Sequence, residues 1–410
     1  MNITSSIEKY FAGQRIIVHY AMTMSAFLFI DLAIFTLNPK SYQLNDWMIN
    51  SAGGFVRRSL GGDLFLFLER LSGVPVNMLV FLVVAPILYI FCRSYFQLVI
   101  SCYEKYWIRP VIFSSAGLLP YAVSDFGGHK EILIFALFAY VAGSLGENDS
   151  ARFRRIAISL FLLPVIAMMH EGLVAWFPFF FALLVTVRLS IGRLAIVILS
   201  AAIISLATIV SIIFRVPISG TYAACHAFRE GLGVFGSEDV LCHAMNGLAL
   251  NAAEMNAKII AELTSHPFWI FVGVVSFLAP VVYAILSTTP ARYIAARNIL
   301  FVSLCLISSA AMIVPLSLVA VDWGRFLSIF VIMFTTGFLA LCSRGLLQFQ
   351  PALRQLDRFS RSDWRYAVAL AVLSCFPAKT IFAFHELAPL YLFPAGLVIA
   401  WVARSKFAAR

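Results

Sequence analysis

The stretch NDWMINSAGGFVRRSLGGDLFLFLER, residues 45–70, places ionisable side chains among paired glycines. Guanidinium groups such as those of Arg57 and Arg58 bind phosphate through two parallel hydrogen bonds and stay charged at any accessible pH. The neighbouring glycines let backbone amides approach an anion closely. The carboxylate of Asp46 is a candidate general base for a hydroxyl group. The stretch therefore predicts a phosphate-binding site with a base beside it.

Two other interpretations of the arginine pair stay open. The guanidinium groups can form ion pairs with Asp63 and Glu69, which follow in the same stretch. Alternatively, their long side chains can reach the headgroups of membrane lipids while the aliphatic stems cover apolar surface. Under either interpretation the arginines bind no substrate. The groups that the two guanidinium groups contact in the structure therefore decide among the interpretations.

Four further clusters carry polar residues: SDFGGHKE at 124–131, MMHEG at 168–172, VDWGRF at 321–326 and AKTIFAFHEL at 378–387. An adjacent carboxylate can orient an imidazole that acts as a base, and a cation can bind the same phosphate as the arginines. The candidates are His170 and Glu171 as a second possible base, Lys130 and Arg325 as phosphate ligands, and Asp125, His129, Glu131 and Asp322 as supporting polar groups.

Each cluster also has a simpler explanation. The HE dipeptide at 170–171 fits a solvated turn between two apolar runs. Asp322 and Arg325 are three residues apart and can form a pair that caps the following helix. Ser124 or Asp125 can likewise cap a helix, although a cap does not account for the HKE run at 129–131. We interpret the HE dipeptide at 385–386 as part of a short outer turn before Pro389.

The elements that position these residues must be membrane helices. Of the 410 residues, 61% are hydrophobic and 12% are charged, against about 25% charged in soluble domains. We predict an all-α, polytopic helix bundle that forms a single membrane domain over 1–410. About 12 apolar segments lie near 16–37, 76–93, 111–123, 129–145, 156–169, 172–188, 193–214, 267–287, 298–317, 325–343, 366–381 and 389–404. The segments 111–123 and 156–169 are short enough to be re-entrant arms.

Lysine and arginine residues concentrate on the cytoplasmic side of membrane proteins. With the N-terminus inside, most of the 30 basic residues fall in inner loops, the largest being the basic loop 344–365. Both termini are then cytoplasmic, and the five polar clusters fall at the extracytoplasmic ends of the segments. Ionisable groups at membrane depth cost a few kcal/mol each unless they are paired or wet, so five clusters on one face predict one site. The net charge of +10 is a topology signal and does not indicate nucleic-acid binding.

Two outer loops are informative. In the first, residues 37–75, the run GGDLFLFLERL at 61–71 predicts an interfacial helix. The larger loop, residues 215–266, contains Cys225 and Cys242, which we expect to form a disulfide in an oxidising compartment. Their neighbours His226 and His243 leave a zinc site as an alternative. Residues 246–263 have the apolar spacing of an amphipathic surface helix.

The sequence contains no nucleotide-binding loop, no Rossmann fingerprint and no HExxH protease motif. Its dozen apolar segments, acidic first outer loop with an interfacial helix, large outer loop and outer arginines resemble GT-C-type membrane glycosyltransferases and the related Wzy-type bacterial polysaccharide polymerases. The resemblance covers the architecture of most of the chain and does not align a signature motif. It implies a multi-pass protein of the bacterial inner membrane that takes polyprenyl-phosphate- or polyprenyl-diphosphate-linked sugars at the extracytoplasmic face.

The chemistry that the resemblance implies is displacement at an anomeric carbon, with a base for the acceptor hydroxyl and cations for the leaving phosphate. No organic cofactor is expected. A divalent cation on Asp125 and Asp322 stays an open alternative, since carboxylates are the usual ligands of hard metals. Membrane lipids and other polysaccharide-assembly proteins are further candidate partners. A secondary transporter or a membrane-bound acyltransferase would use similar residues, so both remain alternatives.

Overall fold

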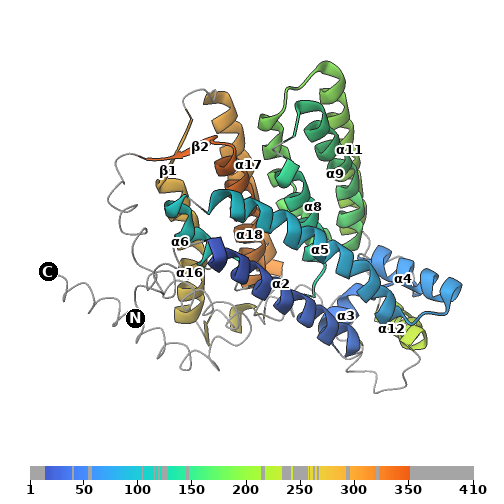
Figure 1. Cartoon of the computed structure of the whole chain (residues 1–410). Helices are drawn as coiled ribbons and strands as arrows, with labels where there is room; N and C mark the ends of the chain where they lie inside the picture. The colour runs from blue at the N-terminus through green and yellow to red at the C-terminus, as the bar shows by residue number, and fades with distance from the viewer. Residues whose placement is uncertain are drawn as a thin grey trace, which may run out of the picture. The chain divides into compact units, whose positions relative to one another are not determined.

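In the computed structural model of the chain (Figure 1), the structure describes residues 14–38, 41–53, 58–103, 105–114, 116–118, 121, 128–144, 147–213, 218–232, 242, 257, 259–261, 264–265, 267–291, 296–319 and 323–350. Several predicted features lie outside these residues. They are Arg57, Asp125, Asp322, the 385–386 dipeptide, the segments 366–381 and 389–404, most of the helix at 246–263, and residues 351–365 of the basic loop.

The described residues are almost entirely helical. In chain order the helices are α2 Gln14–Leu37, α3 Tyr42–Trp47, α4 Ser59–Ser72, α5 Val76–Cys102, η1 Tyr106–Ile108, α6 Arg109–Ile112, α8 Glu131–Gly143, α9 Asp149–Met169, η3 Glu171–Trp176, α10 Pro178–Ala182, η4 Leu183–Thr186, α11 Ile191–Ile213, α12 Ile218–Leu232, α16 Pro267–Leu286, α17 Ala296–Val319 and α18 Trp323–Ser343. Two three-residue strands, β1 Thr288–Pro290 and β2 Leu347–Phe349, pair antiparallel with Thr288 opposite Phe349.

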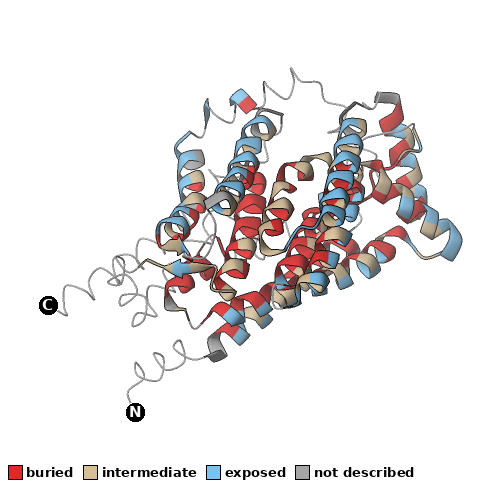
Figure 2. Cartoon of the chain, turned by 90° about the horizontal axis from the view of Figure 1, so that it is seen from above, coloured by how far each residue is buried: buried red, intermediate tan, exposed pale blue. Residues whose placement is uncertain are grey.

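Within the described part of the chain, five helices are long and apolar enough to cross a membrane. They cover Ile17–Leu37, Val76–Cys102, Ile191–Val210, Asn298–Leu316 and Arg325–Ser343. Shorter apolar helices occupy Glu131–Gly143, Glu171–Thr186 and Gly273–Leu286. Exposed residues run along several long helices (Figure 2). Those of α11 include the apolar residues Leu194, Ile198 and Leu206. This composition is that of an all-α, multi-pass membrane protein.

The two segments predicted as short take different forms. Residues 156–169 belong to α9, a continuous 21-residue helix. At the start of the segment 111–123, residues 111–112 end the buried four-residue helix α6, and the described residues 113–114 and 116–118 form turns and bends. Pro110 is the second residue of α6 and fits the first turn, since proline lacks an N–H and the first N–H groups of a helix have no partner inside it,.

The chain divides into two compact units, each made of separate stretches. The first comprises Met1–Phe27, Ser94–Asp125 and Asn256–Arg410. Inside it, the thiol of Cys102 donates to the carbonyl of Leu339 at 3.2 Å, and the Tyr283 hydroxyl donates to the carbonyl of Trp107 at 3.1 Å. The Trp107 ring lies against two phenylalanines, Phe338 edge-on and Phe349 face-on. These contacts join α5, η1, α16, α18 and β2.

The second unit comprises Leu28–Arg93 and Phe126–Met255. Its first loop is packed so closely that two glycines are required. A Cβ on Gly62 of α4 would lie 2.2 Å from the carbonyl oxygen of Ile49, and a Cβ on Gly53 would lie 2.1 Å from that of Gly220. The Asn50 side-chain amide also donates to the carbonyl of Ala224 at 2.8 Å. The first loop is therefore held between α4 and α12.

A disulfide anchors α12 next to this contact. Cys225 of α12 is bonded to Cys242, with the two Cα atoms 5.7 Å apart. The described free cysteines, Cys92, Cys102, Cys305 and Cys342, are all buried. The disulfide limits the separation of α12 from the later part of its loop, and Ala224 beside it carries the acceptor for Asn50.

Candidate functional site

Three neighbouring segments of the second unit carry polar residues at both ends. Helix α8 starts after Lys130, α9 ends at Met169, and the return segment 171–186 starts at Glu171. At the other end, the Arg152 guanidinium of α9 donates to the carbonyl of Thr186, so the return segment comes back to the start of α9. With 21 residues, α9 is about 31 Å long at 1.5 Å per residue, close to the thickness of a hydrocarbon core. The two polar ends are thus separated by about a membrane thickness.

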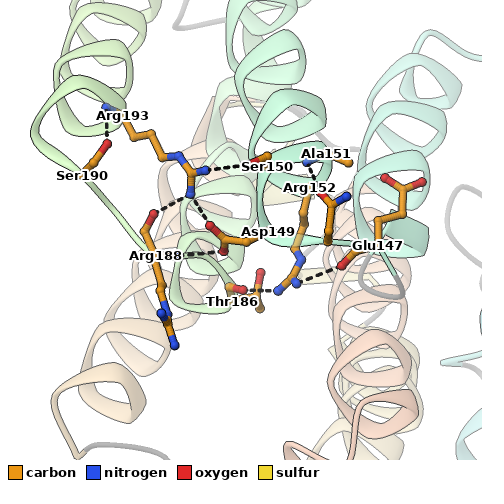
Figure 3. Close-up of polar contacts among 10 residues, drawn as sticks. Glu147, Asp149, Ser150, Ala151, Arg152, Thr186, Arg188, Ser190 and Arg193 are labelled. Carbon is orange, nitrogen blue, oxygen red and sulfur yellow. Dashed lines mark hydrogen bonds and ion pairs between the residues drawn. The ribbon is translucent and has the colours of Figure 1, made fainter.

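Arginines dominate the end near the start of α9 (Figure 3). Arg193 of α11 pairs with Asp149 and donates to the carbonyl of Arg188. Arg155 pairs with Glu147. The Arg193 side chain and the Arg188 N–H hold the pKa of Asp149 below its ordinary value. The Arg188 guanidinium points away from the cluster. By the charge bias of membrane proteins, we predict that this end is cytoplasmic.

The opposite end contains the Arg58 site. The Nε and Nη2 atoms of Arg58 donate to the two carboxylate oxygens of Glu171 at 2.7 and 2.8 Å. This is the two-point geometry that orients a guanidinium most firmly. The side chains are 21% and 13% exposed, respectively. Within the described part of the chain, the hydrogen bonds of the Arg58 guanidinium come from Nε and Nη2, and none comes from Nη1.

The backbone of Arg58 is unusual as well. Arg58 immediately precedes α4 with φ of 69°, the one positive φ of a non-glycine residue within the described ranges. This left-handed conformation costs an ordinary residue about 1–2 kcal/mol. Such strain persists only where the surroundings hold it, and it is frequent at functional sites.

Lys130 contacts the same backbone. Its side chain is completely buried, and Nζ donates to the carbonyl oxygens of Met169 at 3.1 Å and Arg58 at 3.4 Å. Lys130 therefore joins the residue before α4 to the last residue of α9. Glu171, the partner of the Arg58 side chain, follows two residues after that contact.

Asp46 completes the charged group. It lies in α3, is 1% exposed, and interacts electrostatically with both Arg58 and Lys130. No hydrogen bond from a described residue reaches its buried Oδ2 atom. A buried polar atom without a partner is costly, so Oδ2 is suited to receive a proton or a donor group from a ligand.

Two hydrogen bonds, one at the start of α3 and one to a distant segment, hold α3 in place. The hydroxyl of Ser41 accepts from the N–H of Leu44 and caps the helix,. The indole of Trp47 is fully buried and donates to the carbonyl of Gly128 at 2.8 Å. This bond ties α3 to the turn that carries Lys130, and thus brings Asp46 toward the cations.

The cation pKa values reflect this crowding, and both groups lie outside the five candidate spans. Burial lowers the pKa of Lys130 to about 8; Asp46 and Glu171 oppose this effect, and Arg58 adds to it. Burial also acts to lower the pKa of Arg58, but the carboxylates of Glu171 and Asp46 raise it above the ordinary value. Arg58 consequently stays charged at any accessible pH.

The remaining predicted residues of this unit surround the charged group. His129 is buried with its ring 5.8 Å from that of Tyr42, and Glu131, the first residue of α8, is 2% exposed. His170 is buried in extended backbone at the end of α9. Glu171 was predicted as the possible orienting partner of His170, but its carboxylate is bound to Arg58. We therefore assign it to the guanidinium.

Other expected partners are placed elsewhere. Asp63 accepts from the N–H and the hydroxyl of Ser51 at 2.7 and 2.8 Å, so it stabilises the first loop. Arg325 lies at the start of α18 in the first unit, where its side chain is buried. Its phosphate-binding role stays a prediction, as do the roles of Arg57, Asp125 and Asp322. In the described part of the chain, no group of three His, Cys, Asp or Glu side chains is placed to hold a metal ion.

Sequence reasoning did not single out three contributors to this region: Ser51, Asn50 and Trp47. The polar ones lie between Asp46 and Arg58, where a neutral side chain in a loop has no distinguishing signal. Their importance comes from bonds to residues distant in the sequence, which a single sequence does not contain.

Comparisons with protein-family models, with curated proteins and with solved structures found no match to this chain.

Sidedness can be checked by cysteine labelling in intact cells. In a background that keeps the disulfide but lacks the free cysteines, we expect Ala52→Cys to react with a membrane-impermeant maleimide. We expect Arg188→Cys to react only after permeabilisation. Both positions are exposed, so access to the reagent depends on the side of the membrane. Labelling of Arg188→Cys from outside would place the Arg58 site on the cytoplasmic face.

Proposed function

We propose that this protein is an integral membrane glycosyltransferase or polysaccharide polymerase that acts on polyprenyl-phosphate- or polyprenyl-diphosphate-linked sugars. The site would face the extracytoplasmic side of a bacterial inner membrane, with about 12 spans and cytoplasmic termini. The observation that carries the proposal is the charged group of Arg58, Lys130, Glu171 and Asp46 at the end of the helices opposite the arginine-rich end.

The guanidinium supports an anionic substrate. Arg58 is oriented on two of its donor atoms by Glu171 and keeps Nη1 for a third partner. A guanidinium prepared in this way can bind a phosphate oxygen without reorganisation when negative charge develops on it. A charge at the end of a membrane helix is also at the depth where the headgroup of a lipid-linked sugar lies.

The carboxylate supports transfer to a hydroxyl group. In the proposed reaction, Asp46 accepts the proton of the acceptor hydroxyl as its oxygen forms a bond to the anomeric carbon. The bond between that carbon and the phosphate oxygen breaks, and its electron pair stays on the leaving phosphate. Arg58 stabilises the resulting negative charge. His170 remains a second candidate for the base, since it is buried at the end of the neighbouring helix.

The direct test is transfer by the purified protein. We expect it to extend a glycan acceptor when supplied with lipid-linked repeat units from its own host, with release of the polyprenyl carrier, and to need no nucleotide sugar or ATP. A deletion strain should accumulate the lipid-linked units. Binding and transmembrane movement of a solute without any new glycosidic bond would instead favour a transporter, and transfer of an acyl group would favour an acyltransferase.

A further inference from the structure

Lys130 was a candidate phosphate ligand, yet its surroundings differ from those of an exposed anion clamp. The side chain is completely buried, and both described hydrogen bonds of Nζ go to main-chain carbonyls. An ammonium group has three donors and no acceptor. With two donors on carbonyl oxygens, Lys130 has little left for a substrate phosphate.

The two carbonyls belong to the segments that carry the Arg58–Glu171 pair. One is the carbonyl of Arg58 itself, and the other is that of Met169, two residues before Glu171. A bond from one ammonium group to both fixes the separation of the two main chains. The bidentate geometry needs that separation, because two parallel bonds at 2.7 and 2.8 Å tolerate little movement,.

The positive φ of Arg58 also indicates that its main chain is held in place by a neighbouring group. Glycine adopts this conformation freely, whereas arginine must be held in it,. The Arg58 side chain is bound to Glu171, and the Arg58 carbonyl is a second point of attachment. Lys130 is the side chain at that point.

We propose that Lys130 is a positioning residue: it joins the main chains at Arg58 and Met169 and thereby keeps the Arg58 guanidinium aligned on Glu171 for the substrate. The inference rests on the proposed function for its catalytic consequence, but not for its structural one. Other ionisable groups face Lys130 from the packed elements, namely Asp46 from α3, Glu171 from η3 and Glu131 from α8.

A double-mutant cycle on kcat/KM tests the positioning role. We expect Lys130→Met to lower kcat/KM by about 10–100-fold, mainly in kcat. Combined with Arg58→Lys, it should add less than about 3-fold to the loss in Arg58→Lys alone, since residues that act through one another are not additive. Multiplication of the two losses would show that Lys130 binds the substrate independently, and would overturn the proposal.

The variant Lys130→Gln distinguishes the role of the hydrogen-bond donor at position 130 from the role of its positive charge. Its amide can still donate to a carbonyl but carries no charge for a phosphate, so we expect it to recover at least 3-fold in kcat relative to Lys130→Met. Equal losses in the two variants would contradict positioning. Lys105→Met is the matched control, because Lys105 also donates to a main-chain carbonyl, that of Cys342 in the first unit.

Thermal unfolding in detergent gives a reading that needs no enzyme activity. Because a glutamine amide can still donate to the carbonyls of Arg58 and Met169, Lys130→Met should lower the Tm more than Lys130→Gln does,. An equal fall in the two variants would overturn the positioning role. If the natural protein transfers no sugar while the Tm values differ as expected, the proposed function fails and the positioning role stands.

Discussion

Replacing Asp46 with asparagine is expected to lower the rate of sugar transfer by about 100- to 10,000-fold, the usual contribution of a general base. Asparagine has the same shape but cannot take a proton from the acceptor hydroxyl. Binding of the donor should change much less than kcat, because Arg58 retains Glu171 and its Nη1 group. The measurement is the steady-state rate of transfer at several concentrations of the lipid-linked donor, which gives KM and kcat separately.

The control for Asp46→Asn is Asp149→Asn. Asp149 also forms close contacts with an arginine, but at the arginine-rich end near the start of α9. We expect it to leave transfer within about 3-fold of the natural rate. If Asp46→Asn kept full kcat at normal protein levels, Asp46 would not be the base, and His170→Gln would be the next variant to measure.

The residues of the charged group were predictable from sequence for a physical reason. Asp46, Arg58, Lys130 and Glu171 are ionisable groups next to apolar helices, where each is costly without a partner or a function. A residue of this kind stands out in a chain with only 12% charged residues. Helix α4 was predictable from a different signal, the apolar run that follows the glycines.

The pairing within the group was not predictable. Arg58 and Glu171 are 113 residues apart in the sequence, and the nearer carboxylates Asp63 and Glu69 looked equally suitable. Asp63 instead binds Ser51 in the first loop. Which carboxylate meets a guanidinium depends on how the helices pack, and a local pattern contains no information about that.

The structure gives one of the paired glycines a packing role that the sequence did not indicate. The pairs suggested a close approach of backbone amides to an anion, which stays a prediction, and Gly62 lies inside α4, where a Cβ would collide with the carbonyl of Ile49. Close packing requires a glycine at position 62, whereas the positive φ values described in this loop belong to Arg58 and Gly73. Glycine marks both close approach and left-handed backbone, so its presence alone does not distinguish them.

Arg58→Lys isolates the planar guanidinium, and we expect it to reduce transfer by about two to three decades. Lysine keeps the charge and has the same strain at positive φ, since both residues carry a Cβ. It loses the two-point bond to Glu171 and the separate Nη1 donor,. Losing a contact to a developing phosphate charge typically costs on the order of a few kcal/mol, which corresponds to that change in rate.

The assay for Arg58→Lys is the amount and length of extracellular glycan in a deletion strain, together with the level of lipid-linked precursor. We expect normal protein levels, little polymer and accumulated precursor. Arg155→Lys, which alters the ion pair with Glu147 at the other polar end, is the matched control and should leave output near normal. If Arg58 instead anchors the chain to lipid headgroups, lysine would reach them as well as arginine does, and polymer would stay near the natural amount. Full output from Arg58→Lys would therefore remove the phosphate site from the proposal, because the lysine keeps the charge but has no planar guanidinium to bind a phosphate at two points.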